Sequence, residues 1–329
     1  MVLQQASLFP VRLDPRPPPK WFNSPVTFHT GTLSDIGKHI PTFERRPFTL
    51  NLPSAESIGV NSQLDTIVRQ PFGEDKSFMP VGIVSKEYAF LQHTAVLDVA
   101  VKALATAKID PGAVKVDLKI TAYGERMAIS LYLPDKYSFD PGDGNPMAMR
   151  LECLNSVDGS TRFRALMGWF RFVCSNGLVI GVTRSDVRRR HVGGLQINDV
   201  GKVLAAGIAA SATEKRNLVA WRKRPIPAHR IVPWIKKDLR RTWGFKAATR
   251  AFHIAATGHD VEITGQFKQN DPTTIQVQSG ERVKGTPEHS ENLFDLSQIL
   301  AWLAKDRRDL QEQVEWREQI PQLLAPLSK

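Results

Sequence analysis

The alternation of apolar and polar residues in the middle of the chain predicts an antiparallel sheet. Valine, leucine and isoleucine alternate with lysine and aspartate over residues 114–120, which is typical of a strand with one solvated face. Three further apolar runs, 127–133, 147–155 and 163–174, are separated by turn-forming Gly, Pro and Asp. We therefore expect an antiparallel meander of at least four strands.

On both sides of this sheet the apolar spacing changes to three and four residues, which is the period of a helix. The spacing predicts helices over 88–108, 198–224 and 232–252, the first of them capped by Ser85. A long C-terminal helix is expected from Ser290 to about residue 320. The predicted fold class is α+β, an antiparallel β-meander packed against helices.

The first part of the chain has a different composition. Nine of the 22 prolines fall within the first 53 residues, and proline favours extended segments and turns. We expect either an extended arm laid over the body or a disordered leader. The predicted divisions are a Pro-rich N-terminal arm (1–60), an α+β core with the antiparallel sheet (61–195), a basic helical segment (196–257), and short strands or loop followed by the C-terminal helix (258–329).

Charge is concentrated in one part of the sequence. The whole chain carries 44 Lys and Arg against 33 Asp and Glu, a net charge of +11. Residues 182–250 alone hold 17 basic and four acidic residues, so this segment accounts for the entire excess. A localised positive field of this kind attracts polyanions.

Within this segment the basic residues form clusters interleaved with tryptophans. Cations in a row suit phosphates, and aromatic rings provide faces on which unpaired bases stack. A solvated helical face with tryptophans turned to the core is the alternative interpretation. The candidate nucleic-acid-binding residues are Arg188, Arg189, Arg190, Lys215, Arg216, Arg222, Lys223, Arg224, Lys236, Lys237, Arg240, Arg241, Trp221, Trp234 and Trp243.

The sequence contains no phosphate-binding loop, nucleophile elbow, zinc-protease motif or dinucleotide fingerprint. We therefore expect no catalytic residue, no cofactor and no metal. Cys174 with His191 would be the only nucleophile and base to consider, but Cys174 ends an apolar strand and is expected to be buried and unreactive. Asp140 and Asp143 could hold a hard cation, although Asp-Pro and Asp-Gly are more often turn residues. No apolar run is long enough to span a membrane, and the cytoplasm is the expected compartment.

Four short segments resemble a known family. Residues 155–160 (Asn-Ser-Val-Asp-Gly-Ser), 168–178 (Gly-Trp-Phe-Arg-Phe-Val-Cys-Ser-Asn-Gly-Leu) and 190–193 (Arg-His-Val-Gly) are similar to motifs of the phage- and plasmid-related family catalogued as domain of unknown function 932. Residues 81–93 resemble its early motif, with His93 where asparagine is usual. The resemblance implies a mobile-element protein concerned with DNA or host defence. It supplies no catalytic residue. The order of strands and helices also resembles single-strand annealing proteins.

These observations favour a nucleic-acid-binding protein that anneals or protects single strands, with DNA favoured and RNA as the alternative. The second hypothesis is an inhibitor or adaptor that binds a host or phage protein through the same basic residues. A 70-residue basic segment offers only a short binding groove for a single strand, and identical subunits would join such segments into a continuous track. We therefore also expect a homo-oligomer in which the arm from Leu8 to Pro53 reaches a neighbouring subunit.

Overall fold

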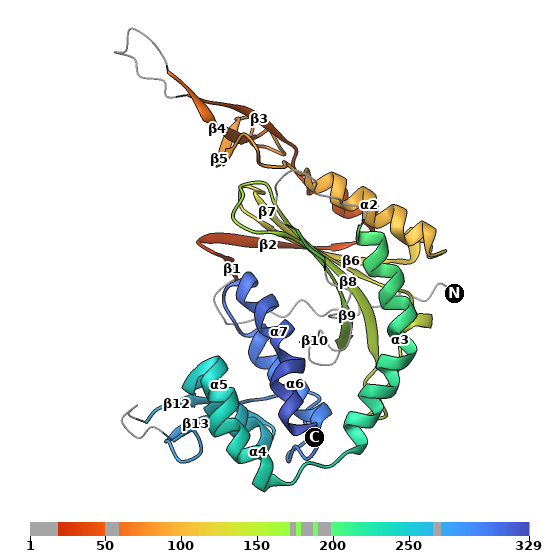
Figure 1. Cartoon of the computed structure of the whole chain (residues 1–329), viewed down its shortest axis with the longest axis vertical. Coiled ribbons are helices and arrows are strands. Elements are labelled where there is room, and N and C mark those ends of the chain that lie inside the picture. Colours follow the sequence, from red (N-terminus) through yellow and green to blue (C-terminus); the bar gives the residue numbers. More distant parts are fainter. Residues whose placement is uncertain are drawn as a thin grey trace, which may run out of the picture.

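The computed structural model describes residues 19–49, 59–171, 176–178, 187–189, 199–265 and 271–328. Its centre is a curled antiparallel sheet in the order β1-β2-β6-β7-β8-β9-β10, with β11 pairing beside β10 on β9 (Figure 1). The strands of this sheet are β1 (Lys20–Trp21), β2 (Ser24–Gly31), β6 (Lys115–Thr121), β7 (Arg126–Tyr132), β8 (Met147–Ser156), β9 (Phe163–Arg171), β10 (Asn176–Leu178) and β11 (Val187–Arg189).

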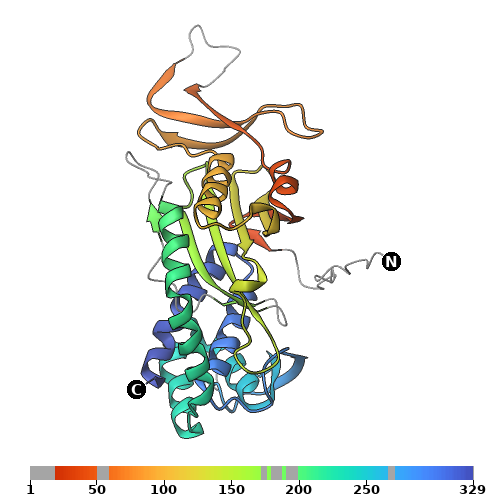
Figure 2. The same ribbon diagram turned by 90° about the vertical axis from the view of Figure 1, so that its right-hand side faces the viewer.

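Two smaller sheets lie at opposite ends of the molecule (Figures 1 and 2). A three-stranded sheet of β3 (Phe43–Thr49), β4 (Val60–Arg69) and β5 (Met79–Ser85) projects beyond the main sheet. A pair formed by β12 (His259–Ile263) and β13 (Val277–Arg282) lies at the other end, beside α5. The helices are α1 (Leu33–Gly37), α2 (His93–Thr106), α3 (Asp199–Lys223), α4 (Ala228–Trp234), α5 (Arg240–Thr257), α6 (Leu293–Lys305) and α7 (Leu310–Leu324).

The α+β prediction and the meander are confirmed. Strands β6, β7, β8 and β9 pair in sequence order, each antiparallel to the next. The alternation that predicted the first strand is visible in its burial, because Val116, Leu118 and Ile120 are buried while Lys115 and Lys119 remain partly or fully exposed.

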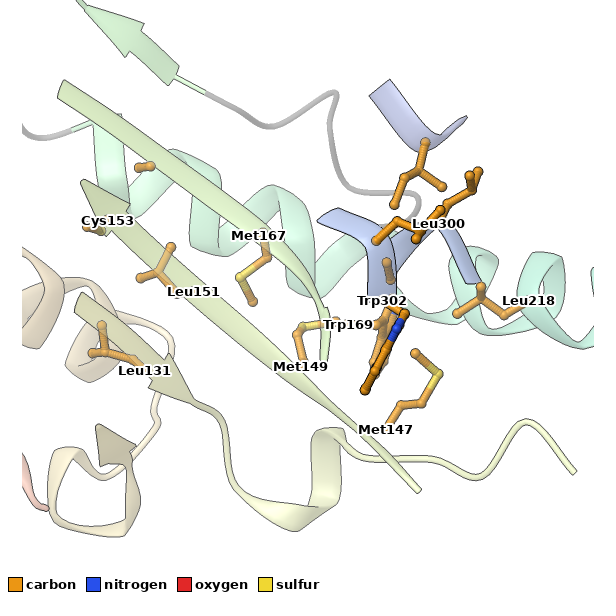
Figure 3. Packing of buried hydrophobic residues seen from close by; sticks show 14 of the residues in the cluster. Leu131, Met147, Met149, Leu151, Cys153, Met167, Trp169, Leu218, Leu300 and Trp302 are labelled. Carbon is orange, nitrogen blue, oxygen red and sulfur yellow. The ribbon is translucent and has the colours of Figure 1, made fainter. Parts of the chain in front are cut away.

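Both faces of the central part of the sheet are covered. One face contributes residues such as Met149, Leu151 and Trp169 to the main core, where they pack with side chains of α3 and α6 (Figure 3). On the opposite face α7 inserts Leu310 and Val314 into a second apolar cluster. Burying a large apolar side chain stabilises a fold by roughly 1.5–3 kcal/mol, so these two layers hold the sheet in place.

Several predicted boundaries differ from the structure. Ser85 ends β5 instead of capping a helix, and α2 begins eight residues later with Gln92 as its N-cap. The C-terminal helical region is divided into α6 and α7, capped by Asn292 and Asp309. Ser290 does not cap a helix there, because α6 begins at Leu293 with Asn292 as its N-cap. The N–H of Ser290 instead donates to the carbonyl of Ala255 at 2.8 Å.

Part of the predicted N-terminal arm belongs to the sheets. β2 pairs with β6 over residues 26–31, and β3 pairs with β4, so these backbones find hydrogen-bond partners within the same chain. Among the described residues, no helix is long and apolar enough to cross a membrane.

Candidate nucleic-acid interface

The basic segment folds into two helical arms joined by a proline-containing turn. α3 ends at Lys223, and Pro225 and Pro227 separate it from α4. A π-helical turn over residues 235–239 connects α4 to α5, and Gly244, at a φ of 85°, introduces a kink close to the start of α5. The single helix predicted over 232–252 is therefore a composite of α4, the π turn and α5.

Three of the predicted cations are paired with carboxylates. Lys236 pairs with Asp271 at 2.8 Å, and Arg222 approaches Asp143 at 3.8 Å. The exposed guanidinium of Arg241 lies 3.6 Å from Asp238 in the same helical stretch. The positive charge of this segment is thus smaller at the surface than the sequence count suggests.

Three lysines of this segment have no ion-pair partner among the described residues. Lys223, Lys237 and Lys246 are exposed and form no ion pair with any residue that the structure describes. Lys223 ends α3, Lys237 lies in the π turn and Lys246 lies in α5, so the three follow the helical path from one arm to the next. An array of solvated ammonium groups is suited to phosphate contacts.

The remaining predicted cations make contacts of other kinds. Arg216 is exposed and donates to the Thr213 hydroxyl at 3.0 Å, and Arg224 donates to the carbonyl of Ser328. Arg240 lies over the ring of Phe245 at 5.4 Å. The ammonium of Lys215 is directed inward, 5.5 Å from the ring centres of both Phe139 and Trp169, which makes it part of the packing between α3 and the sheet.

The predicted cluster at 188–190 lies elsewhere. Arg188 and Arg189 belong to β11, which pairs with the first residues of β9, and Arg190 falls outside the described residues. Arg222 instead approaches the last residue of β9, Arg171, through their shared partner Asp143. These two points on β9 are about 20 Å apart, because six strand residues separate them. The cluster at 188–190 and Arg222 lie near opposite ends of this strand, so the predicted residues do not form one continuous patch.

The tryptophans are core residues in the structure. Trp234 is buried and donates from Nε1 to the carbonyl of Leu323 at 2.8 Å. Trp243 donates to the Gln319 side chain at 2.7 Å, and Trp221 is partly buried against the main core. The expectation that Trp234 and Trp243 offer free faces to bases is therefore wrong, because helix α7 occupies the space beside them.

A pocket that the sequence does not predict lies between the β1–β2 turn, α5 and the start of α7. Its volume is about 370 Å³, and its lining combines aromatic with charged residues. From the basic segment it includes Trp243, Lys246, Ala247 and Arg250. The other contributors are Lys20, Phe22, Leu303, Asp306, Arg307, Arg308, Asp309, Glu312 and Trp316. Only the structure brings Lys20 and Arg308 next to Lys246, since they are far apart in the sequence.

The aspartate-rich loop is held to the protein by arginines. Asp140 accepts hydrogen bonds from the N–H groups of Gly142 and Asp143, and the Asp143 carboxylate is paired with the fully buried guanidinium of Arg171. Nearby, burial raises the pKa of Asp295 to about 6, against the opposing effect of hydrogen bonds and of Arg222 and Arg171. The described part of the chain contains no group of three His, Cys, Asp or Glu side chains placed to hold a metal ion.

A second charged cluster is buried beneath α7. The Arg317 guanidinium contacts the Glu152 carboxylate at 3.0 and 3.1 Å, and Arg150 reaches the same carboxylate at 2.9 Å. Burial alone would raise the pKa of Glu152, but the two guanidinium groups lower it to about 2. Burial lowers the pKa of neighbouring Lys119 to about 8. These charges face one another and join α7 to the sheet.

The motif segments recognised in the sequence meet in a structural junction. The Tyr88 hydroxyl donates to the carbonyl of Ser156 at 2.9 Å, and His93 and Asn155 are hydrogen-bonded at 2.9 Å. Gly82 lies so close to Asp158 that a Cβ atom at position 82 would come within 2.7 Å of the Asp158 Cα. These motif residues hold the projecting sheet and α2 against the main sheet.

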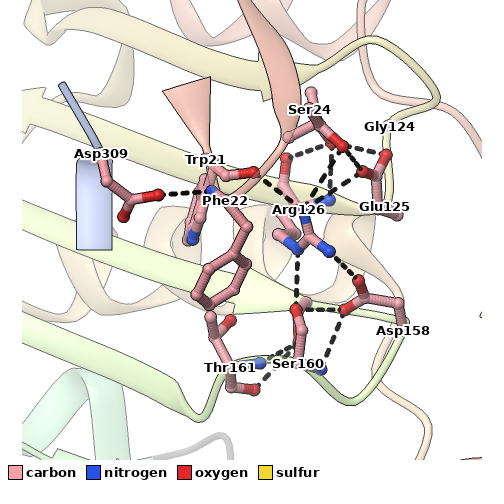
Figure 4. Close-up of polar contacts among 12 residues, drawn as sticks. Trp21, Phe22, Ser24, Gly124, Glu125, Arg126, Asp158, Ser160, Thr161 and Asp309 are labelled. Carbon is pink, nitrogen blue, oxygen red and sulfur yellow. Dashed lines mark hydrogen bonds and ion pairs between the residues drawn. The ribbon is translucent and has the colours of Figure 1, made fainter. Parts of the chain in front are cut away.

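An arginine beside this junction shows how the following turn is fixed. Arg126 donates to Asp158 at 2.6 Å, to Ser160 at 2.7 Å and to the carbonyl of Trp21 at 2.9 Å (Figure 4). The motif residues from 155 to 160 are thereby tied to the β1–β2 turn.

Comparison with known proteins identifies a family and a similar bacterial protein. Residues 80–279 match the family described as domain of unknown function (DUF932). A stretch of 80 residues is 37% identical to the UPF0380 protein YafZ of Escherichia coli (strain K12) and covers 24% of this chain and 29% of that protein. This chain therefore matches less than a third of the relative's length. No solved structure matches the chain.

Proposed function

Because the chain belongs to the family described as domain of unknown function 932, whose description names no activity, we propose a function from its residues: it binds single-stranded nucleic acid through the surface of α3, α4 and α5. The observation that carries the proposal is the set of exposed lysines without ion-pair partners among the described residues, Lys223, Lys237 and Lys246. Three of the surrounding cations, Arg222, Lys236 and Arg241, are paired with carboxylates, whereas these three ammonium groups are solvated and suited to phosphate contacts.

The biological setting follows from the same proposal. A protein of a mobile genetic element that anneals or protects single strands would need this surface, with DNA favoured over RNA. Assembly into a homo-oligomer would join short basic surfaces into a longer track. The described part of the N-terminal arm pairs within its own chain, so assembly would use other surfaces of the protein.

The test is a salt titration with a matched charge control. We expect a fluorescein-labelled dT20 to bind the parent protein, with log K falling linearly as log salt rises. Replacing Lys223, Lys237 and Lys246 together by alanine should make this slope shallower by about 2, since each single-strand phosphate contact contributes about 0.7. The control replaces Lys86, Lys102 and Lys115, which are equally exposed but lie on other elements, and should leave the slope close to that of the parent.

The inhibitor or adaptor hypothesis predicts a different result. An acidic protein partner would engage the same lysines, but dT20 would then bind equally weakly to the parent, the triple variant and the control. Failure of the parent to bind dT20 at about 50 mM salt would reject the nucleic-acid proposal, because the electrostatic contribution is strongest at low salt.

A further inference from the structure

We propose that the pocket between the β1–β2 turn, α5 and α7 receives one unpaired base of a bound single strand together with its phosphate. The inference rests on the proposed function and assigns it a specific site. At about 370 Å³ the pocket falls within the range of roughly 300–1,000 Å³ that is usual for small-molecule sites. A base and its phosphate need a planar platform and a positive charge, and this pocket has both.

The platform is a column of three planar groups. The rings of Trp243 and Trp316 are stacked with centres 4.3 Å apart and an angle of 16° between their planes. The Arg307 guanidinium lies over the Trp316 ring at 4.5 Å. The two indole rings and the guanidinium are thus held together in the lining of one pocket. Bases stack on guanidinium groups as they do on aromatic rings.

Hydrogen bonds at both ends hold this column in place. At one end Trp243 donates from Nε1 to Gln319 at 2.7 Å. At the other end Arg307 donates from Nε and Nη2 to the Glu312 carboxylate at 2.9 and 2.7 Å. These bonds use Nε and Nη2, and the Arg307 side chain is still 39% exposed. The platform is thus organised before any ligand arrives, which reduces the entropic cost of binding.

The charges around the column leave an excess of cations. Three carboxylates line the pocket, and each already has partners: Asp306 is paired with Arg250, Glu312 with Arg307, and Asp309 accepts backbone N–H groups. Lys20, Lys246 and Arg308 also line the pocket, and their side chains form no ion pair within the described part of the chain. These three cations come from distant parts of the chain and line the same pocket, so they are available to a phosphate bound there.

The wall formed by the β1–β2 turn is fixed to α7. The N–H of Lys20 donates to the carbonyl of Arg308 at 2.9 Å, and the N–H of Phe22 donates to the Asp309 carboxylate (Figure 4). Phe22 has a φ of 53° in a two-residue turn, a position that usually takes glycine. Holding a phenylalanine there costs on the order of 1 kcal/mol, and such conformations are concentrated at ligand sites.

The experiment separates base stacking from charge. We compare dT20 with an abasic 20-mer of equal charge, using the parent protein and the variants Trp316→Leu and Arg308→Ala. The parent should bind dT20 about tenfold more tightly than the abasic strand, since stacking of one base contributes ~1–3 kcal/mol. In Trp316→Leu this preference should disappear, because the column that supports Arg307 is lost. In Arg308→Ala both strands should bind more weakly and the preference should remain.

Photo-crosslinking provides a readout that does not depend on the stability of a variant. A dT20 carrying 5-bromodeoxyuridine is irradiated with the parent protein, and the crosslinked peptide is identified by mass spectrometry. We expect the crosslink within residues 20–22, 243–250 or 307–316. The substitution Tyr123→Leu, at an exposed ring outside the pocket, should change neither measurement.

The outcomes distinguish the two proposals. Binding of dT20 without a preference over the abasic strand, or crosslinks only outside the pocket, would overturn this inference and leave the proposed function intact. A parent protein that binds neither strand would overturn both.

Discussion

Asn155 on β8 donates a hydrogen bond from Nδ2 to Nδ1 of His93 at the start of α2, at 2.9 Å. The other ring nitrogen of His93 lies 2.8 Å from the carbonyl of Gly124, and Nδ2 of Asn155 also donates to the carbonyl of Leu91 at 3.0 Å. Both side chains are fully buried. The pair therefore joins α2, the β6–β7 turn and β8, and fixes the tautomer in which Nε2 of His93 carries the proton.

We predict that Asn155→Ala lowers the free energy of unfolding by about 2–3 kcal/mol, because it leaves His93 Nδ1 and the Leu91 carbonyl buried without a donor. Urea unfolding followed by circular dichroism measures the change. Asn217→Ala, on the exposed face of α3, is the matched control and should change stability by less than about 0.5 kcal/mol. Equal effects of the two substitutions would contradict a structural role for the pair.

Gly82 provides a second test of the same junction. A methyl group at this position would lie 2.7 Å from the Cα and 2.8 Å from the Cβ of Asp158, and backbone atoms cannot move aside easily. We expect Gly82→Ala to destabilise the protein by about 1–3 kcal/mol through overpacking. Gly59→Ala meets no atom within 4 Å and should be tolerated. Thermal unfolding of the two variants side by side measures the difference, and a wild-type Tm for Gly82→Ala would disprove the close approach.

Cys153 is buried in the main core, where burial raises the pKa of its thiol to about 12. Because the thiolate is the reactive form, we predict that Cys153 reacts with a thiol reagent at neutral pH only after the protein unfolds. Mass spectrometry of labelled peptides distinguishes it from Cys174, which lies outside the described residues and whose burial stays a prediction. Rapid labelling of Cys153 in the native protein would mean that the core opens at this strand.

The meander could be predicted from the sequence because its signal is local. A period of two residues with one solvated face is visible within seven residues, as in β6, and turns between successive strands fix their pairing. The strand β2 was not predicted, since its pairing partner β6 is about 90 residues away. Ser85 has the side chain of an N-cap, but pairing of β5 with Leu64 holds it in a strand, and tertiary pairing overrides a local capping preference.

The candidate site was harder to predict because charge compensation and burial depend on distant residues. Asp271 lies 35 positions from Lys236, and Asp306 lies 56 positions from Arg250, so a count along the chain misses both ion pairs. The tryptophan pattern alone cannot show that α7 packs beside Trp234 and Trp243. The basic segment is visible in the sequence and its role stays a prediction, whereas its exposed cations without ion-pair partners among the described residues could be recognised only in three dimensions.

Asp295, in the first turn of α6, predicts a dependence of stability on pH. Burial raises its pKa from 3.8 to about 6, so the folded protein holds a proton that the unfolded chain releases at lower pH. The contribution of Asp295 to the free energy of unfolding is therefore greatest below about pH 4. It falls by up to about 3 kcal/mol as the pH rises towards 6. Asp295→Asn removes the ionisation and keeps an oxygen that can accept hydrogen bonds.

We expect Asp295→Asn to exceed the parent in unfolding free energy by about 1–3 kcal/mol at pH 7.5, since the parent then keeps a charge in a buried position. The advantage should shrink steadily as the pH is lowered to 4, where the parent carboxyl is protonated. Urea unfolding at half-unit steps of pH measures both proteins, with Asp98→Asn, an exposed aspartate of α2, as the control for the substitution itself. The prediction would be contradicted if the two proteins differed in unfolding free energy by the same amount at pH 4 and at pH 7.5. The aspartate would then be as well solvated in the fold as in the unfolded chain.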